Sequence, residues 1–219
     1  MEESKHVAVV DFGSQYTQLI VRRVRELGYF AKLYALEEFE EMGAPGAIIL
    51  SGGPKSTSEA DAPDIDFAKL QAYGCPVLGV CYGMQLLNIK FGGTVKGSNL
   101  REYGPAALRP ESCSGLYEGV SHESQVWMSH SDTVETLGKG AKVLASNQHG
   151  TPVSLKWEER FYGIQFHPEV THSHEGLRIL HNFLLTAEEL QEFHIEDFKR
   201  AMVESIRETV GDKQVVCGV

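Results

Sequence analysis

The sequence has no long apolar run and no excess of basic residues, and each absence excludes a class of protein. Because no run of about 18 apolar residues occurs, we predict no transmembrane helix. The first ten residues, MEESKHVAVV, open acidic and lack the basic region and the long apolar core of a signal peptide. With 20 Lys and Arg against 30 Asp and Glu, the formal net charge is −10, so neither nucleic acid nor a membrane surface is expected as a partner.

Cysteine is also scarce, with 4 in 219 residues and no CxxC pair. A chain of this length, 42% hydrophobic, is large enough for one sizeable core and does not need disulfide bonds. We therefore expect reduced cysteines and a cytoplasmic protein. One cysteine is a candidate for reactivity, and packing roles are expected for the remaining three, which are Cys75, Cys113 and Cys217.

Short apolar runs alternate with segments of helical periodicity, which is the pattern of parallel βαβ units. We expect strands at 6–10, 30–36, 47–50, 76–80 and 161–166, and helices at 15–27, 64–73, 82–91 and 175–185. Right-handed crossovers would place helices on both faces of a mostly parallel, twisted sheet. The predicted fold class is therefore α/β.

Two regions depart from this alternation. Residues 95–108 and 125–155 contain several short candidate strands, which either extend the sheet or form a small antiparallel one. From Glu188 onward the chain is charged and helical through Ile206, and it ends in an apolar strand-like run, 214–219. Because that run has no turn and no partner, we expect the natural chain to continue beyond it.

The sharpest local feature is Gly79-Val80-Cys81-Tyr82-Gly83, between an expected strand and an expected helix. Small residues on either side of a nucleophile permit a tight strand-to-helix turn that lifts its side chain above the sheet. Cys81 would then lie at a helix N-terminus, which favours the reactive thiolate. The alternative is an inert buried cysteine. Gln85, one helical turn later, either contacts a substrate beside the sulfur or is an ordinary solvated residue.

A thiolate nucleophile usually works with a base that a third group orients. Among nine histidines, only His167 combines a strand end, a carboxylate two residues away, that of Glu169, and a following loop. Residues two apart on an extended backbone face the same side, so Glu169 can accept a hydrogen bond from one imidazole nitrogen. The alternative is a metal site that also uses His172 and His174, but the spacing fits no standard ligand pattern.

Two further segments contain candidate binding groups. Residues 51–57, SGGPKST, resemble a phosphate loop superficially, but Pro54 stands where a Walker A sequence requires glycine. An oxyanion hole is the better hypothesis, because a glycine-rich turn after a parallel strand can present free N–H groups. Residues 127–132, WMSHSD, are predicted to form a compact polar loop that either binds the two ends of an amino acid or is merely solvated.

Together these segments resemble the class I, triad-type glutamine amidotransferases over residues 6 to 186. The resemblance rests on Gly79 to Gln85 for the nucleophile, on Phe166 to Val170 for the base and on Ser51 to Pro54 for the oxyanion strand. It implies a flavodoxin-like fold. It also implies that Cys81 forms a γ-glutamyl thioester, that His167 transfers protons and that Glu169 orients His167.

The same resemblance implies the remaining site residues. The N–H groups of Gly53 and Tyr82 would hold the oxyanion, and no metal is expected. Glutamine would be bound by a set of polar residues: Gln85, Ser129, Ser131 and Asp132. The family usually has glycine where this chain has Ser131. A positive φ there would strain serine.

Within the family, Val10 to Tyr16 and Arg22 to Glu26 resemble the start of the GMP synthases, and residues 197–219 resemble the linker and first strand of their ATP pyrophosphatase domain. This implies a glutaminase domain at 1–188 and a truncated second domain at 189–219. The full enzyme would be a homodimer that uses ATP and Mg to aminate XMP, whereas the glutaminase domain would need no cofactor. The SGGVDS loop of the second domain is absent, so this chain would not activate XMP by itself.

Three alternatives remain open at this point. The chain could serve anthranilate or carbamoyl phosphate synthesis, although its N-terminal run and its tail argue against both. It could also be a catalytically silent interaction domain, or a cysteine peptidase on a related α/β scaffold.

Overall fold

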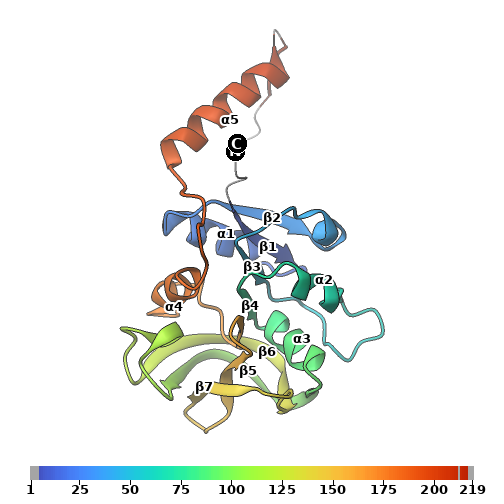
Figure 1. Cartoon of the computed structure of the whole chain (residues 1–219), viewed down its shortest axis with the longest axis vertical. Helices are drawn as coiled ribbons and strands as arrows, with labels where there is room; N and C mark the ends of the chain where they lie inside the picture. Colours follow the sequence, from blue (N-terminus) through green and yellow to red (C-terminus); the bar gives the residue numbers. More distant parts are fainter. Residues whose placement is uncertain (1–4, 212, 217–219) are drawn as a thin grey trace.

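Five parallel strands form one half of the sheet in the computed structural model, which describes residues 5–211 and 213–216 (Figure 1). In spatial order they are β2 (Ala31–Ala35), β1 (Val7–Asp11), β3 (Ala47–Leu50), β4 (Val77–Val80) and β9 (Phe161–Ile164). Most of their residues are fully buried, as expected for strands covered on both faces. The expected strands are confirmed to within two residues at each end.

The antiparallel strands continue the same sheet. Among the described residues the sheet has nine strands, in the order β2-β1-β3-β4-β9-β8-β7-β5-β6. The four added strands are β8 (Pro152–Trp157), β7 (Lys142–Asn147), β5 (Thr94–Pro110) and β6 (Ser124–Thr136). Of the two alternatives for this region, extension of the sheet is therefore the one observed. The expectation of short strands was wrong for β5 and β6, which reach 17 and 13 residues because they pair with each other along most of their length.

Helices cover both faces of the parallel half, which confirms the α/β fold class. The helices α1 (Thr17–Glu26) and α4 (Gly176–Leu184) share one hydrophobic cluster with Val7 and Val9 of β1. The opposite face, which includes Ala8 and Val10, packs against α2 (Phe67–Ala72), α3 (Tyr82–Lys90) and the 3₁₀ helix η1 (Leu36–Glu41). Alternate residues of β1 thus supply two separate cores, as the two-residue period of a strand requires. A second 3₁₀ helix, η2 (Gly115–Tyr117), packs against α4.

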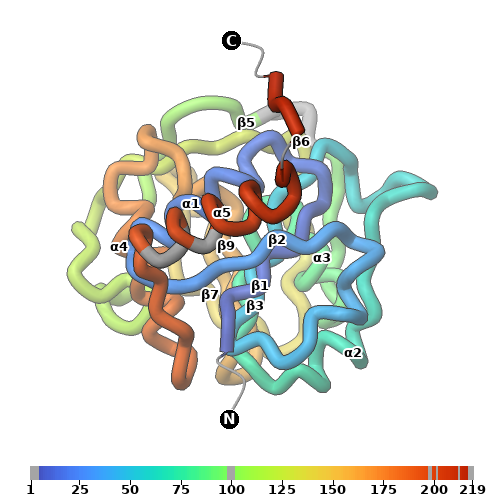
Figure 2. Tube along the Cα trace, turned by 90° about the horizontal axis from the view of Figure 1, so that it is seen from above, coloured from blue at the N-terminus to red at the C-terminus, as the bar shows by residue number. Residues whose placement is uncertain are grey.

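The C-terminal segment is attached to the sheet region at first, and its last helix stands apart. Residues 190–193 are attached by the bridges of Leu190 to Lys5 and of Glu192 to Tyr29. The helix α5 (Ile195–Val210) then stands away from the sheet (Figure 1) and crosses above β2 in the view from above (Figure 2). Residues 214–216 form no strand, and the rest of the expected terminal strand lies outside the described residues. Within the described chain, no helix is both long and apolar enough to span a bilayer.

The topology gathers several loops at one edge of the sheet. The carboxyl ends of β1, β3, β4 and β9 meet there, because these four strands are parallel neighbours. The residues that follow these strands are Phe12 to Tyr16, Ser51 to Gly53, Cys81, and Gln165 to His167. In open α/β sheets this edge is where ligands bind.

Candidate active site

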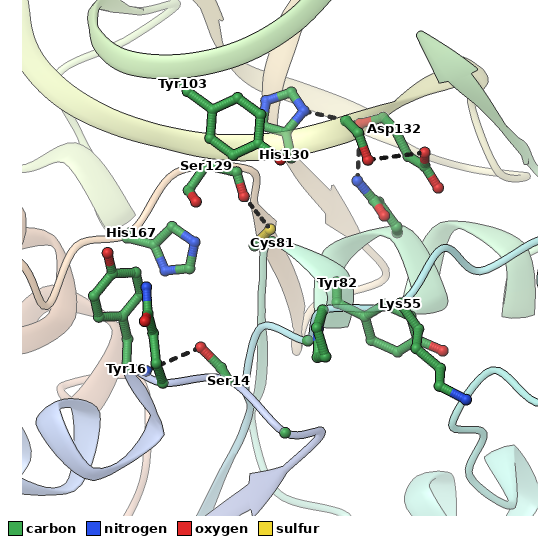
Figure 3. A pocket seen from close by; sticks show the side chains of 16 residues that line it. Ser14, Tyr16, Lys55, Cys81, Tyr82, Tyr103, Ser129, His130, Asp132 and His167 are labelled. Carbon is green, nitrogen blue, oxygen red and sulfur yellow. Dashed lines mark hydrogen bonds between the residues drawn. The ribbon is translucent and has the colours of Figure 1, made fainter.

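A cavity of about 460 Å³ opens at this edge and gathers almost all of the predicted site residues. Cys81 lies at its centre, with His167 on one side and Ser129 and His130 on another (Figure 3). Among the predicted residues, the cavity is lined by Gly53, Cys81, Tyr82, Gln85, Ser129, Ser131, Asp132 and His167. Glu169 does not line the cavity and lies behind His167, to which it is hydrogen-bonded.

Cys81 occupies a strained turn between β4 and α3. Its backbone has φ 52° and ψ −104°, a region that L-residues rarely adopt and that persists where the surroundings enforce it. The backbone segments around the turn approach so closely that only glycine fits: a Cβ on Gly79 would lie 2.5 Å from Gly83, and one on Gly83 would lie 2.5 Å from the Leu50 carbonyl oxygen. The turn therefore requires both glycines, and it holds the thiol at the N-terminus of α3.

His167 joins Cys81 to Glu169. Its Nδ1 lies 2.7 Å from Oε1 of Glu169, and both side chains are almost fully buried. Burial alone would lower the pKa of His167, but the interactions with Cys81 and with the Glu169 carboxylate outweigh it and raise that pKa to about 10. The imidazolium form is thus stabilised beside the thiol. The ring of Tyr16 packs edge-on against His167 at 5.1 Å, which limits its rotation.

The loop after β9 is fixed by main-chain contacts. The His167 N–H donates to the Trp127 carbonyl at 3.0 Å, and the Ser173 hydroxyl donates to the His167 carbonyl at 2.5 Å. Arg23 of α1 donates from Nε to the Glu169 carbonyl at 2.9 Å. Contacts with β6 and α1, and one within the loop itself, therefore hold the main chain of His167 and Glu169 in place.

The glycine turn after β3 comes close to the reactive groups. A Cβ on Gly52 would lie 3.2 Å from Cε1 of His167 and 3.6 Å from Cβ of Cys81, while one on Gly53 would lie 2.9 Å from the Phe12 carbonyl oxygen. Within residues 5–211 and 213–216, neither the Gly53 N–H nor the Tyr82 N–H donates a hydrogen bond to another protein group. Both residues line the cavity, so these donors remain available to a ligand.

The expectation of a loop at 127–132 was wrong, because these residues lie inside strand β6 and pair with β5. The buried side chains alternate along the strand, and this alternation turns His130 and Asp132 inward. The Ser129 carbonyl accepts a hydrogen bond from the Cys81 thiol at 3.6 Å. Ser131 does not have a positive φ, so the serine in place of the usual glycine is not strained.

The Asp132 carbonyl links two side chains of the pocket wall. It accepts hydrogen bonds from Nε2 of Gln85 at 3.0 Å and from Nδ1 of His130 at 2.9 Å. The Asp132 carboxylate accepts from the hydroxyl of Ser56 and, at 3.4 Å, from that of Ser131. This wall is consequently rich in acceptors, which suits a cationic or N–H-bearing part of a ligand.

Sequence reasoning missed several residues of the pocket, among them Ser14, Gln15, Tyr16 and Tyr103. The first three follow the carboxyl end of β1, so the rule that ligands bind at this edge could have found them. Sequence reasoning gave no role of their own to Lys55 and His130, which lie in its two candidate binding segments. His130 is buried, and its Nε2 lies 3.4 Å from Oε2 of Glu102. Burial lowers the pKa of His130, and the Glu102 carboxylate offsets this only in part.

The other candidate groups lie elsewhere. His172 packs on Trp127 with ring centroids 4.5 Å apart, and Nε2 of His174 contacts Gln125 at 3.3 Å. Among the described residues, no cluster of three or more His, Cys, Asp or Glu side chains could hold a metal ion. Burial raises the pKa of the Cys75 thiol to about 11, Cys113 lies 3.5 Å from His122, and Cys217 is outside the described residues.

Known proteins resemble this chain along most of its length. The family model for glutamine amidotransferase class-I matches residues 8–187. The GMP synthase [glutamine-hydrolyzing] of Thermosipho melanesiensis is 44% identical over 98% of this chain, and that of Bacillus subtilis is 42% identical over 97%. The chain spans 42% of the length of each of these relatives.

Solved structures share the fold. A protein of Thermoplasma acidophilum, provisionally assigned as one of the subunits of a GMP synthase, superimposes with a TM-score of 0.74 at 26% identity, over 93% of this chain and 100% of the other. A glutamine amidotransferase of Thermotoga maritima superimposes with a TM-score of 0.61 at 18% identity, over 94% of this chain and 86% of the other.

Proposed function

Since the chain belongs to the class-I glutamine amidotransferase family, we propose that it hydrolyses L-glutamine to glutamate and ammonia through Cys81, His167 and Glu169. One observation carries the proposal: a cysteine held at a strained helix N-terminus lines the same cavity as a histidine whose Nδ1 lies 2.7 Å from a buried carboxylate. This arrangement supplies a nucleophile, a proton carrier and an orienting group.

The proposed reaction starts when the Cys81 sulfur attacks the carboxamide carbon of glutamine. The negative charge that develops on the carboxamide oxygen is held by the N–H groups of Gly53 and Tyr82. The protonated His167 gives its proton to the departing nitrogen, so ammonia leaves and a γ-glutamyl thioester remains. His167 then takes a proton from water, the resulting hydroxide attacks the thioester, and glutamate and the thiolate are released.

Substrate recognition is assigned to the acceptor-rich wall. Gln85, Ser129, Ser131 and Asp132 are proposed to bind the α-amino and α-carboxylate groups of glutamine. The cavity of about 460 Å³ is large enough for one amino acid, and Cys81 lies at its centre.

We further propose that the ammonia aminates XMP to GMP in a longer protein. The support is the naming of the relatives, of which this chain matches only 42% of the length. The remaining part would be an ATP pyrophosphatase domain that uses ATP and Mg, and the full enzyme would be a homodimer. No cofactor is proposed for the glutaminase domain itself.

The first test is a glutaminase assay on the purified chain that measures glutamate and ammonia. The wild type should release both in equal amounts, and Cys81→Ala should release neither while melting at the same temperature, because only one side chain at the sheet edge is lost. Release of glutamate by the folded Cys81→Ala variant would refute the assignment of the nucleophile. Cleavage of peptides instead of glutamine would favour a peptidase.

The second test concerns the larger protein. The chain alone should hydrolyse glutamine slowly, and a GMP synthase pyrophosphatase domain with ATP, Mg and XMP should accelerate it. The proposed switch is the Gly52-Gly53 peptide, which can turn at little cost because glycine tolerates both signs of φ. One misdirected oxyanion donor lowers a rate by roughly 100- to 1000-fold. A full rate from the chain alone would contradict this coupling.

A further inference from the structure

The orientation of the Gln85 side chain depends on a residue just after β9 that has no role in the reaction above. The Asp132 main-chain oxygen can only accept, so the group that faces it at 3.0 Å must be the Gln85 amide nitrogen. The second hydrogen of that nitrogen is directed to Oε1 of Gln165, 3.1 Å away. Both hydrogens are thus used, and Oε1 is the polar atom that the Gln85 side chain leaves to the cavity.

We infer that Gln165 is a positioning residue that locks the Gln85 amide with its oxygen toward the substrate. This inference rests on the proposed glutaminase function. A fixed acceptor at Gln85 favours the N–H groups of a ligand, such as the α-ammonium of glutamine, over its carboxylate. Without Gln165, the amide loses one of its two anchors and can turn its nitrogen toward the ligand.

The setting of Gln165 supports a role other than packing. Its side chain is only 3% exposed, and the main-chain N–H donates to the Val153 carbonyl at 2.9 Å, so the backbone is fixed by β8. Its own Nε2 is buried without a hydrogen-bond partner among the described residues. A buried amide with an unpaired nitrogen destabilises a core compared with an apolar side chain of the same shape. The acceptor at Oε1 is therefore the useful part of this residue.

Two substitutions distinguish the effect of the acceptor oxygen of Gln165 from the effect of its side-chain size. Gln165→Met keeps a similar size and removes the acceptor. Gln165→Glu keeps an acceptor oxygen, because a carboxyl buried at this position is expected to be protonated. If Gln165 acts through Gln85, the KM for glutamine should rise about fivefold to tenfold in Gln165→Met and stay within about threefold in Gln165→Glu. Since the reacting atoms are untouched, kcat should stay within about threefold in both variants.

The decisive experiment is a double-mutant cycle with Gln85→Met, measured as KM and kcat for glutamine hydrolysis and as glutamine affinity in the Cys81→Ala background. Gln165→Met should add nothing to Gln85→Met, because its effect passes through that side chain. Additive losses, an equally impaired Gln165→Glu, or a fall in kcat at unchanged KM would each overturn the inference. If Gln165→Met does not fold, Gln165→Asn replaces it, because its shorter amide cannot reach Gln85.

These results are distinguishable from a failure of the proposed function. The wild-type rate of glutamine hydrolysis reports on the function, whereas the pattern among the variants reports on Gln165. An active wild type with an additive cycle refutes only the role of Gln165. A wild type that neither hydrolyses nor binds glutamine refutes both.

Discussion

Two histidines line the same cavity, each with a glutamate behind it, and only one of them is built for proton transfer. In the pair after β9, Nδ1 of His167 and Oε1 of Glu169 are 2.7 Å apart, and the interactions with Cys81 and Glu169 raise the pKa of His167 to about 10 in spite of its burial. In the pair across β5 and β6, His130 and Glu102 are 3.4 Å apart, and burial lowers the pKa of His130. Both histidines are buried, so burial does not explain the difference between them. The neighbouring groups do, because they favour a charged His167 and leave His130 neutral.

The neighbouring groups also determine which ring nitrogen of each histidine is available for proton transfer. Nδ1 of His167 faces a carboxylate, which leaves Nε2 as the nitrogen available to exchange a proton with Cys81. Nδ1 of His130 faces the Asp132 carbonyl, so a neutral His130 keeps its proton there and presents an unprotonated Nε2 to Glu102. His130 is thereby suited to stabilise the pocket wall and not to transfer protons to the substrate.

The largest expected difference between the pairs is in catalysis. His167→Ala should lower kcat for glutamine hydrolysis by at least about 1000-fold, because the residue acts in both proton transfers. His130→Ala should change kcat by less than about tenfold, since its effect is on substrate binding. Steady-state kinetics on the two folded variants measure both values. Equal losses of kcat in the two variants would contradict the different roles given to His167 and His130.

Glu169→Ala should have an intermediate effect. The carboxylate orients His167 without touching the substrate, so kcat should fall by about 10- to 100-fold, less than in His167→Ala. The matched control is Glu169→Gln, which keeps a hydrogen-bond acceptor for Nδ1 and removes the charge. A larger loss in Glu169→Ala than in His167→Ala would contradict the assigned roles.

The two histidines should also have opposite effects on the pH dependence of stability. A histidine with a raised folded pKa stabilises the protein fully below its unfolded value of about 6.5, and this contribution disappears as the pH rises toward about 10. A histidine with a lowered folded pKa destabilises the protein as the pH falls below about 6.5, because the unfolded chain binds the proton more readily.

Melting temperatures between about pH 5 and pH 10 test this contrast, because that range includes both transitions. His167→Gln should flatten the decline on the alkaline side, and His130→Gln should flatten the decline on the acid side. If both variants changed the same side, the opposite pKa shifts would be wrong.

The smallest effect is expected for Glu102→Gln. Its amide nitrogen can donate to Nε2 of His130, which is buried without a hydrogen-bond partner among the described residues. We expect an unchanged or slightly higher melting temperature and a kcat within about threefold of wild type. Calorimetry and the glutaminase assay measure these values. A large loss of kcat would make Glu102 and His130 part of the reacting machinery.

The comparison also shows what the sequence can predict. Cys81 and the pair of His167 and Glu169 are encoded locally, in a glycine-flanked turn and in a strand end with a carboxylate two residues later. The parallel strands and their helices were predictable for the same reason, because each is a short segment with its own periodicity. The structure places these local motifs together at one edge of the sheet.

The missed features depend on partners far away in the chain. Residues 127–132 form a strand because β6 pairs with β5. Their partners in β5, such as Tyr103 opposite Ser129, lie far from them in the sequence. Gln165 contacts a residue 80 positions earlier, and Asp132 contacts Gln85 across 47 positions. No periodicity or motif within a short window encodes such contacts, so they became visible only in the folded chain.

Covalent trapping by an electrophilic analogue of glutamine, located by peptide mass spectrometry, tests directly whether Cys81 is the nucleophile. Cys75 and Cys113 are internal controls, since both are free thiols and neither lies in the cavity. We expect one label per chain, on Cys81, that excess glutamine prevents and that His167→Ala slows by at least about tenfold. A label on Cys75 or Cys113 instead, or labelling of Cys81 that glutamine does not prevent, would contradict this assignment.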